Sequence, residues 1–381
     1  MFTCPPILPY FTPLPALTLQ GEANLGIPAW LAAVEADLDK ALASGTPIRQ
    51  VVMGRCCAID SMMEALFELY ELDQTDLTLF ATGGYGRGEL HPFSDVDLLL
   101  LSPNPIDEAL NQKISPFVAK LWDIGIDPAL VVRSVEECDE ACHDDITVAT
   151  SLLEARILAG NVAQAGLPMQ LLNKNWSQTK FYEAKMAEAK ARYLKHNSTE
   201  YNLEPDLKNA PGGLRDIHTV SWISKRYFRV TNLFGLVQQE FITEKEFDEL
   251  QEAEDFLWLI RHHLHKIAKR NENRVLFDYQ RLIAERIGYR DNSHPNAAVE
   301  QFMRDYYRYA MSNSTLSEML TQHYYETLIE ARLPDEQRPM HKVINERFKL
   351  VGDRIAVTHT RVFAQHPTAI LEMFLLMGQQ N

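Results

Sequence analysis

The sequence predicts an α+β protein in which a small mixed β-sheet is followed by a predominantly α-helical region. Residues 77–81 and 96–101 are short apolar runs bounded by turn residues, a pattern typical of buried strands. From about residue 145 onward, apolar residues recur at a spacing of three to four, which indicates helices. At 381 residues the chain is too long for one ordinary core, so we expect at least two domains.

The first domain is expected at residues 25–145, after a proline-rich leader at residues 1–24. Residues 29–42 and 48–72 have the periodicity of two amphipathic helices and precede the first strand. A helix at residues 106–123 then leads to a third strand at residues 126–132. This order predicts a mixed sheet of modest size.

A helical domain at residues 146–330 is expected to complete a cleft with the first domain. Its predicted helices span residues 146–159, 178–196, 214–229, 244–269, 279–287 and 297–325. Prolines and paired glycines make residues 204–213 a conspicuous loop. Residues 331–381 are expected to form a connector and the start of an incomplete further domain, with a hairpin at 348–358 and a helix at 369–377.

Composition narrows the classes of function. The formal net charge is −15, from 37 basic and 52 acidic residues, which disfavours a long nucleic acid as partner. No window offers eighteen apolar residues for a membrane span, and the N-terminus lacks the basic start of a signal peptide. The five cysteines are odd in number and form no paired CxxC, so we expect no disulfide framework, no zinc finger and a reducing cytoplasm.

Two carboxylates, Asp95 and Asp97, lie two residues apart at the start of the second predicted strand. Side chains alternate along a strand, so both should face the same side while Val96 and Leu98 point into the core. Two converging carboxylates repel each other unless a cation lies between them, and hard oxygen ligands suit Mg²⁺. The pair therefore predicts a divalent-metal site that also accepts phosphates.

A glycine-rich segment, residues 83–88, follows the first predicted strand. Gly83 and Gly84 allow backbone N–H groups to approach phosphate oxygens, and Arg87 adds a forked cation. A capping role for the aspartates or an ordinary turn for the glycines would explain either motif alone. Their combination, about ten residues apart, predicts one catalytic site.

This combination resembles the DNA polymerase β nucleotidyltransferase superfamily, whose pattern is a Gly-Gly or Gly-Ser turn, then Asp-x-Asp, then a third carboxylate on a later strand. Gly84 stands where many relatives have serine. For the third carboxylate the resemblance favours Asp127 as a metal ligand or base, with Asp123 as the alternative.

The full string at residues 83–97, GGYGRGELHPFSDVD, resembles the signature of bacterial PII uridylyltransferase/uridylyl-removing enzymes. Residues 204–217, 273–278 and 352–355 resemble further segments of that family in the same order. The resemblance implies transfer of UMP from UTP to a tyrosine of the nitrogen-signalling protein PII, with Mg²⁺ or Mn²⁺ as cofactor. It covers the N-terminal part of the family, whose members continue into phosphohydrolase and glutamine-sensing domains.

In the loop at residues 204–213 and just beyond it, Lys208 and Arg215 are cations that could reach the triphosphate. The alternative is that the loop caps the following helix, with Asp216 in its first turn, and the two roles are compatible. His91 is expected to be structural, and His262, His263 and His265 to form a partly solvated helix surface. Two other functions stay open: adenylyl transfer of the glutamine synthetase-modifying type, and a non-catalytic PII-binding module.

Overall fold

The computed structural model describes residues 26–196, 201–230, 232–290, 294, 296–334, 341–352, 354–359 and 361–380. The expected leader at residues 1–24 lies outside these residues. The chain forms two compact units, residues 1–320 and residues 321–381, and each is described here by itself.

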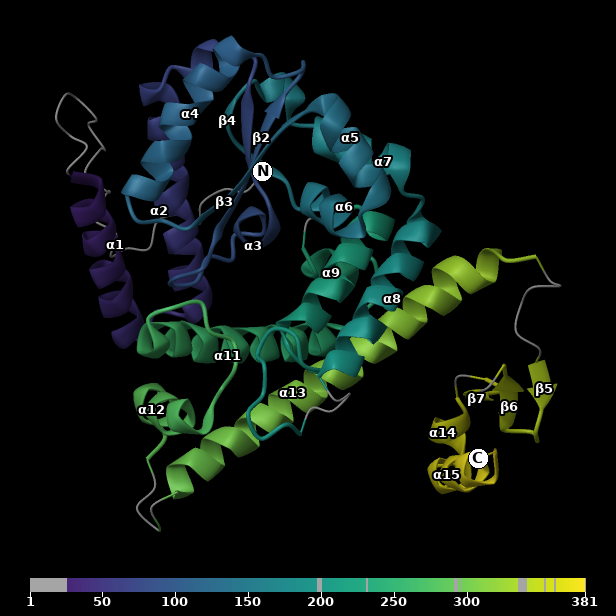
Figure 1. The fold of residues 1–381 in the computed structure, drawn as a ribbon. Helices are drawn as coiled ribbons and strands as arrows, with labels where there is room; N and C mark the ends of the chain where they lie inside the picture. Colours follow the sequence, from purple (N-terminus) through teal and green to yellow (C-terminus); the bar gives the residue numbers. More distant parts are fainter. Residues whose placement is uncertain are drawn as a thin grey trace. The chain divides into compact units, whose positions relative to one another are not determined.

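A four-stranded mixed sheet forms the centre of the first unit, in the order β3-β2-β1-β4 (Figure 1). Its strands are β1 (Thr78–Ala81), β2 (Val96–Ser102), β3 (Pro128–Ser134) and β4 (Arg156–Gly160). Strand β1 is antiparallel to both β2 and β4, and β2 is parallel to β3. The helix α4 (Glu108–Asp123) makes the crossover between the two parallel strands. The mixed sheet predicted from the sequence is confirmed.

One predicted element is wrong. The expected helix at residues 146–159 is a shorter helix, α6 (Ile146–Leu153), followed by the edge strand β4. A short apolar run fits either a strand or a buried helix segment. In this protein the run forms a strand because it pairs with β1, where Ile157 and Ala159 are the register partners of Phe80 and Leu79. The sheet therefore extends beyond the expected domain boundary at residue 145.

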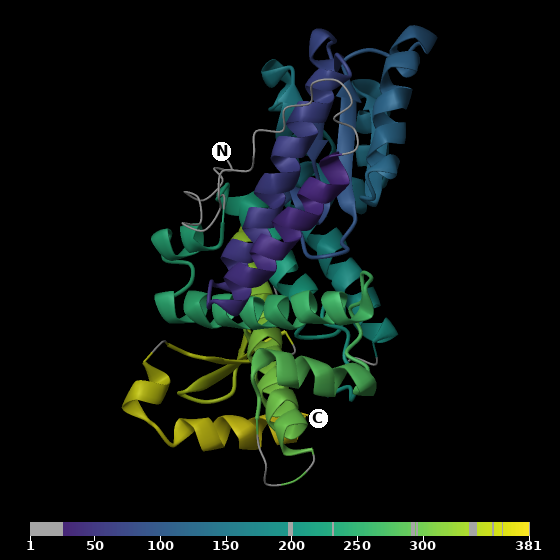
Figure 2. The ribbon, with the colours of Figure 1, turned by 90° about the vertical axis from the view of Figure 1, so that its left-hand side faces the viewer.

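The two faces of the sheet are covered by different helices (Figures 1 and 2). Leu79, Leu98 and Leu100 pack with residues of α1 (Gly26–Ala43), α2 (Ile48–Leu69) and α4. Phe80, Leu99 and Leu101 pack on the opposite face with residues of three other helices, α5 (Val135–Asp144), α6 and α7 (Leu167–Asn175). The alternation of neighbouring strand residues between two buried faces explains why these strands are continuously apolar.

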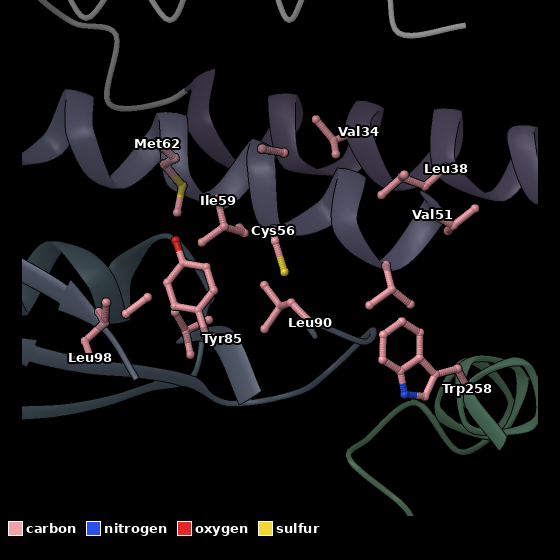
Figure 3. Close-up of a cluster of buried hydrophobic side chains, with 14 of the residues drawn as sticks. Val34, Leu38, Val51, Cys56, Ile59, Met62, Tyr85, Leu90, Leu98 and Trp258 are labelled. Carbon is pink, nitrogen blue, oxygen red and sulfur yellow. The ribbon is translucent and has the colours of Figure 1, made fainter. Parts of the chain in front are cut away.

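A buried tyrosine fixes the glycine-rich segment to this core. Tyr85 lies between α2 and the sheet, beside Ile59 and Met62 (Figure 3). Its hydroxyl donates to Asp60 Oδ1 at 2.6 Å, and Arg156 forms an ion pair with the same carboxylate at 2.8 Å. The position of the glycine-rich segment is thus set by packing and by a buried charged network.

The remainder of the first unit is helical, as predicted. Its further α-helices are α8 (Gln178–Lys195), α9 (Leu214–Phe228), α10 (Phe234–Gln238), α11 (Glu244–Ala268), α12 (Phe277–Ile287) and all but the last turn of α13 (Ala297–Tyr324). Short 3-10 turns occur at η2 (Leu72–Gln74) and η3 (Val162–Gln164). The sequence analysis missed α5, α7 and α10.

The second unit carries an antiparallel sheet of β5 (His341–Val343), β6 (Phe348–Val351) and β7 (Arg354–Val357). Strands β6 and β7 form the predicted hairpin, and the predicted final helix is α15 (Ala369–Gln380). The unit also contains η4 (Tyr325–Ile329), η5 (Glu330–Arg332) and α14 (Val362–Gln365).

Among the described helices, none has the length and apolarity required to cross a membrane. Cys56, Cys138 and Cys142 are buried and free.

Candidate active site

The two predicted carboxylates lie where β2 begins. Asp95 directly precedes the strand and is exposed, whereas Asp97 is half-buried between the core residues Val96 and Leu98. Asn271 Nδ2 donates to Asp95 Oδ1 at 2.9 Å. Burial and the charge of Asp95 raise the pKa of Asp97 to about 6, although nearby donors and cations act in the opposite direction. A bound cation would stabilise the ionised form of such a carboxylate.

The glycine-rich segment forms a helical turn, α3 (Gly83–Gly86). The N–H of Gly84 donates to the carboxylate of Asp97, so this donor already binds the aspartate. Gly83 has a φ of 52°, and a Cβ at this position would lie 2.4 Å from Asp97 Oδ2. Glycine is therefore required here both by backbone conformation and by the close approach of Asp97.

Arg87 follows this turn and is held by two carboxylates. Its guanidinium donates to both oxygens of Glu89, at 2.8 and 2.9 Å, and to Glu154 Oε1 at 2.6 Å. Burial opposes ionisation, but Glu154 and Glu89 more than compensate and raise the pKa of Arg87. Arg87 lines the cavity at the aspartates, but its charge is already balanced within the described residues.

The predicted loop brings two cations together. The N–H of Arg215 donates to the carbonyl of Lys208 at 2.9 Å, so the chain folds back on itself at this point. Gly212 makes the bend with a φ of 76°, and a Cβ there would lie 2.2 Å from the carbonyl oxygen of Ala310. Asp216 accepts from the Gly212 N–H at 2.7 Å, which confirms its expected place in the first turn of α9.

A cavity of about 280 Å³ joins these parts. It is lined by seven of the eight predicted site residues, Gly83, Gly84, Arg87, Asp95, Asp97, Lys208 and Arg215. Residues as far apart in the chain as Gly83 and Arg215, 132 positions, therefore line one cavity.

Lys208 and Arg215 are half-buried cations that have no carboxylate partner within 4.0 Å in the part of the chain that the structure describes. Burial and the neighbouring positive charges of Arg261, Arg215 and Arg87 lower the pKa of Lys208 to about 8. Burial and Arg87 likewise lower the pKa of Arg215. Both side chains carry a positive charge that an anionic ligand would stabilise.

Further residues line the cavity, among them Glu154, Lys185, Trp222 and Arg261, which the sequence analysis did not identify. Lys185 lies 3.9 Å from the centroid of the Trp222 ring, and Arg215 lies 5.2 Å from it. Lys185, Trp222 and Arg261 lie on helices and Glu154 directly follows α6, so no sequence motif marked them.

Asp127 is the one predicted site residue that is absent from the residues lining this cavity. Its carbonyl accepts from the Val96 N–H at 2.8 Å, and its side chain is exposed. It stands two residues before Ala129, the register partner of Asp97. Its role as third carboxylate stays a prediction, as does the alternative, Asp123, which is the last residue of α4.

The histidines divide into two groups. His91 is buried with 1% exposure beside Trp258, which confirms a structural role. The expectation of a solvated surface for the α11 histidines is wrong for His262 and His265, which are 1% and 0% exposed. The ring of His265 contacts the carbonyl of Pro92, so α11 packs directly against the segment leading to Asp95.

The carboxylates fit a divalent metal ion. Asp95 and Asp97 share a cavity with five cationic side chains, a composition suited to an ion bound together with phosphates. Burial and the charge of Asp95 raise the pKa of Asp97, and a bound cation would offset both effects.

Comparisons with known proteins agree with this geometry. Residues 62–150 match the nucleotidyltransferase domain family, and residues 180–321 match the family described as GlnD PII-uridylyltransferase. The chain is 62% identical to a bifunctional uridylyltransferase/uridylyl-removing enzyme of Psychrobacter sp. (strain PRwf-1) and 57% identical to one of Psychrobacter arcticus. Each alignment covers 100% of this chain and 43% of the relative. A similar enzyme of Acinetobacter baumannii is 48% identical over 92% of this chain and 40% of its own length. The chain thus spans about two fifths of the length of the curated relatives it matches.

Proposed function

We propose that this chain, as the N-terminal part of a bifunctional uridylyltransferase/uridylyl-removing enzyme, transfers UMP from UTP to a tyrosine of PII. The proposed products are uridylylated PII and pyrophosphate. The observation that carries the proposal is that two carboxylates, Asp95 and Asp97, and two cations, Lys208 and Arg215, line one cavity without forming an ion pair within 4.0 Å among the described residues.

A metal-bound nucleoside triphosphate would complement both sets of charges. Asp95 and Asp97 would hold Mg²⁺ or Mn²⁺, with Asp127 as a proposed third ligand or base. The ion supplies charge stabilisation for the attacking and leaving oxygens. Lys208 and Arg215 would bind the β- and γ-phosphate oxygens, whose negative charge grows as pyrophosphate leaves.

The transfer itself is a displacement at the α-phosphorus. The tyrosine oxygen forms a bond to this phosphorus, the bond to the bridging oxygen of the β-phosphate breaks, and the phenolic proton passes to a base. The helical turn that carries Gly83 and Gly84 holds Asp97 through the N–H of Gly84, which keeps the carboxylate directed into the cavity.

The test uses the chain with UTP labelled at the α-phosphate, Mg²⁺ and purified PII. We expect label on PII and release of unlabelled pyrophosphate, both abolished in Asp95→Asn and Asp97→Asn. PII whose acceptor tyrosine is replaced by phenylalanine controls for the site of transfer.

Each of the other functions has a distinct outcome in the same assay. Label transferred to glutamine synthetase from ATP, with none transferred to PII from UTP, would support the adenylyltransferase. Binding of PII without turnover, and without any effect of Asp97→Asn, would support a non-catalytic module.

A further inference from the structure

A second cluster of potential metal ligands lies beside Arg87, and two of its members, Glu89 and His218, also line the cavity at the aspartates. It consists of Glu89, His218 and Glu254, whose ligand atoms all lie within 4.8 Å of one another. The three residues line a cavity of about 1050 Å³, which a solute can enter. Glu89 follows the glycine turn, His218 belongs to α9 and Glu254 belongs to α11, so the cluster connects three elements of the first unit.

His218 supplies the independent sign that a ligand is missing. The residue is 3% exposed, and its Nδ1 has no hydrogen-bond partner in the described part of the chain. Its Nε2 lies 3.0 Å from Glu89 Oε2, and this contact with Glu89 acts to raise the pKa of His218, which burial lowers. A neutral imidazole always has one nitrogen lone pair. Burying that lone pair without a partner costs free energy, which a bound cation would recover.

The carboxylates keep the capacity to bind an ion. Arg87 takes one hydrogen bond to each oxygen of Glu89, and each carboxylate oxygen offers two lone pairs. Arg49 binds Glu254 through Oε2 at 2.6 Å, which leaves Oε1 for another ligand. Tetrahedral donors about 2.1 Å from an ion lie roughly 3.4 Å apart, so modest side-chain rotations would close the site.

We propose that Glu89, His218 and Glu254 form a binding site for a divalent transition-metal ion of the Zn²⁺ type, separate from the Asp95–Asp97 site. One imidazole and two carboxylates favour such an ion over Mg²⁺, which prefers oxygen ligands and retains its waters. Glu89 also holds Arg87, which lines the cavity at the aspartates. An ion at this second site would therefore fix the position of Arg87.

The test is equilibrium dialysis against Zn²⁺ in excess Mg²⁺. It uses the metal-free Asp95→Asn/Asp97→Asn variant, so that binding at the first site does not contribute. We expect each chain to bind one Zn²⁺ at the cluster. The substitutions His218→Gln and Glu254→Gln should each lower the affinity for Zn²⁺ at least tenfold. His143→Ala, on an exposed part of α5, is the matched control and should bind as before.

Substitution with Co²⁺ adds a spectroscopic readout. We expect visible ligand-field absorption that disappears in His218→Gln, while thermal unfolding of the metal-free variant confirms that it folds. Retention of the full Zn²⁺ stoichiometry in both His218→Gln and Glu254→Gln would overturn the proposal. So would loss of all Zn²⁺ binding in the Asp95→Asn/Asp97→Asn background alone.

Discussion

Replacing Lys208 by methionine should weaken nucleotide binding and at the same time stabilise the free protein. The ammonium group is half-buried among Arg87, Arg215 and Arg261, and burial with these charges lowers its pKa from 10.5 to about 8. At 1.36 kcal/mol per pH unit, the charged form costs the folded state roughly 1–3 kcal/mol. Methionine keeps most of the apolar stem and removes this cost.

The pH dependence follows from the sign of the shift. Between about pH 8 and 10.5 the unfolded state binds more protons than the folded state, so the stability of the wild type rises with pH in this range. The cost is fully present below pH 8. We therefore expect Lys208→Met to be more stable than the wild type at pH 7, with the difference shrinking as the pH approaches 10.5.

Activity should change in the opposite direction. A charge-assisted hydrogen bond to phosphate contributes about 1.5–3 kcal/mol, so kcat/KM for UTP should fall by roughly 10- to 150-fold. Urea unfolding and initial-rate kinetics measure the two effects, with Lys245→Met, an exposed lysine of α11, as the control. A variant that is less stable and has unchanged kcat/KM for UTP would refute this assignment of Lys208.

Three other outcomes test separate parts of the structure. Asp97→Asn should lower transfer by at least about 1000-fold, because it removes a ligand of the catalytic ion, yet leave the fold intact by circular dichroism. Gly83→Ala should lose about 1–3 kcal/mol of stability and most activity, since its Cβ would lie 2.4 Å from a carboxylate oxygen. If the variant unfolded in urea with the same free energy as the wild type, no strain would be present. Burial alone would raise the pKa of Glu35, but Arg55 and Lys266 lower it to about 2. The stability difference between wild type and Glu35→Gln should be full above pH 4.5 and vanish as the pH falls towards 2, and a pH-independent difference would exclude this ion-pair contribution.

The parts of the fold that sequence predicted are those with long periodic patterns. Helices α9, α11 and α13 agree with the predicted ranges to within a residue, because their apolar stripes extend over several turns. The error at residues 155–159 has a tertiary cause. Whether that short run becomes a strand depends on the free edge of β1, and the chain around the run contains no sign of that edge.

The site divides in the same way. Asp95, Asp97, Lys208 and Arg215 could be found because each lies in a short motif that bends or ends an element. Lys185 and Glu154 could not, since a buried charge on a helix is recognised only from what it contacts in space. The prediction for the histidines of α11 was wrong for a related reason. A polar helix face is predicted to be exposed to solvent unless the segment that packs against it is known.

The arrangement of charge implies that metal ion and nucleotide bind cooperatively. Lys208 lowers the pKa of Asp97, yet the net effect of the site still leaves this pKa raised, so the two sets of charges do not neutralise each other. An ion alone would relieve the carboxylates and increase the repulsion felt by Lys208 and Arg215. A triphosphate alone would relieve the cations and increase the repulsion felt by Asp95 and Asp97.

When both ligands are bound, the repulsion among the carboxylates and the repulsion among the cations are both reduced. Each ligand should therefore increase the affinity for the other by the same factor. Isothermal titration of Mn²⁺ with and without a non-hydrolysable UTP analogue measures this factor, which we expect to be about 10-fold or more. In Lys208→Met the factor should decrease while the affinity for Mn²⁺ alone increases, because the variant loses a positive charge near the aspartates. Equal Mn²⁺ affinity in the presence and absence of the analogue would show that the carboxylates and the cations act as independent sites.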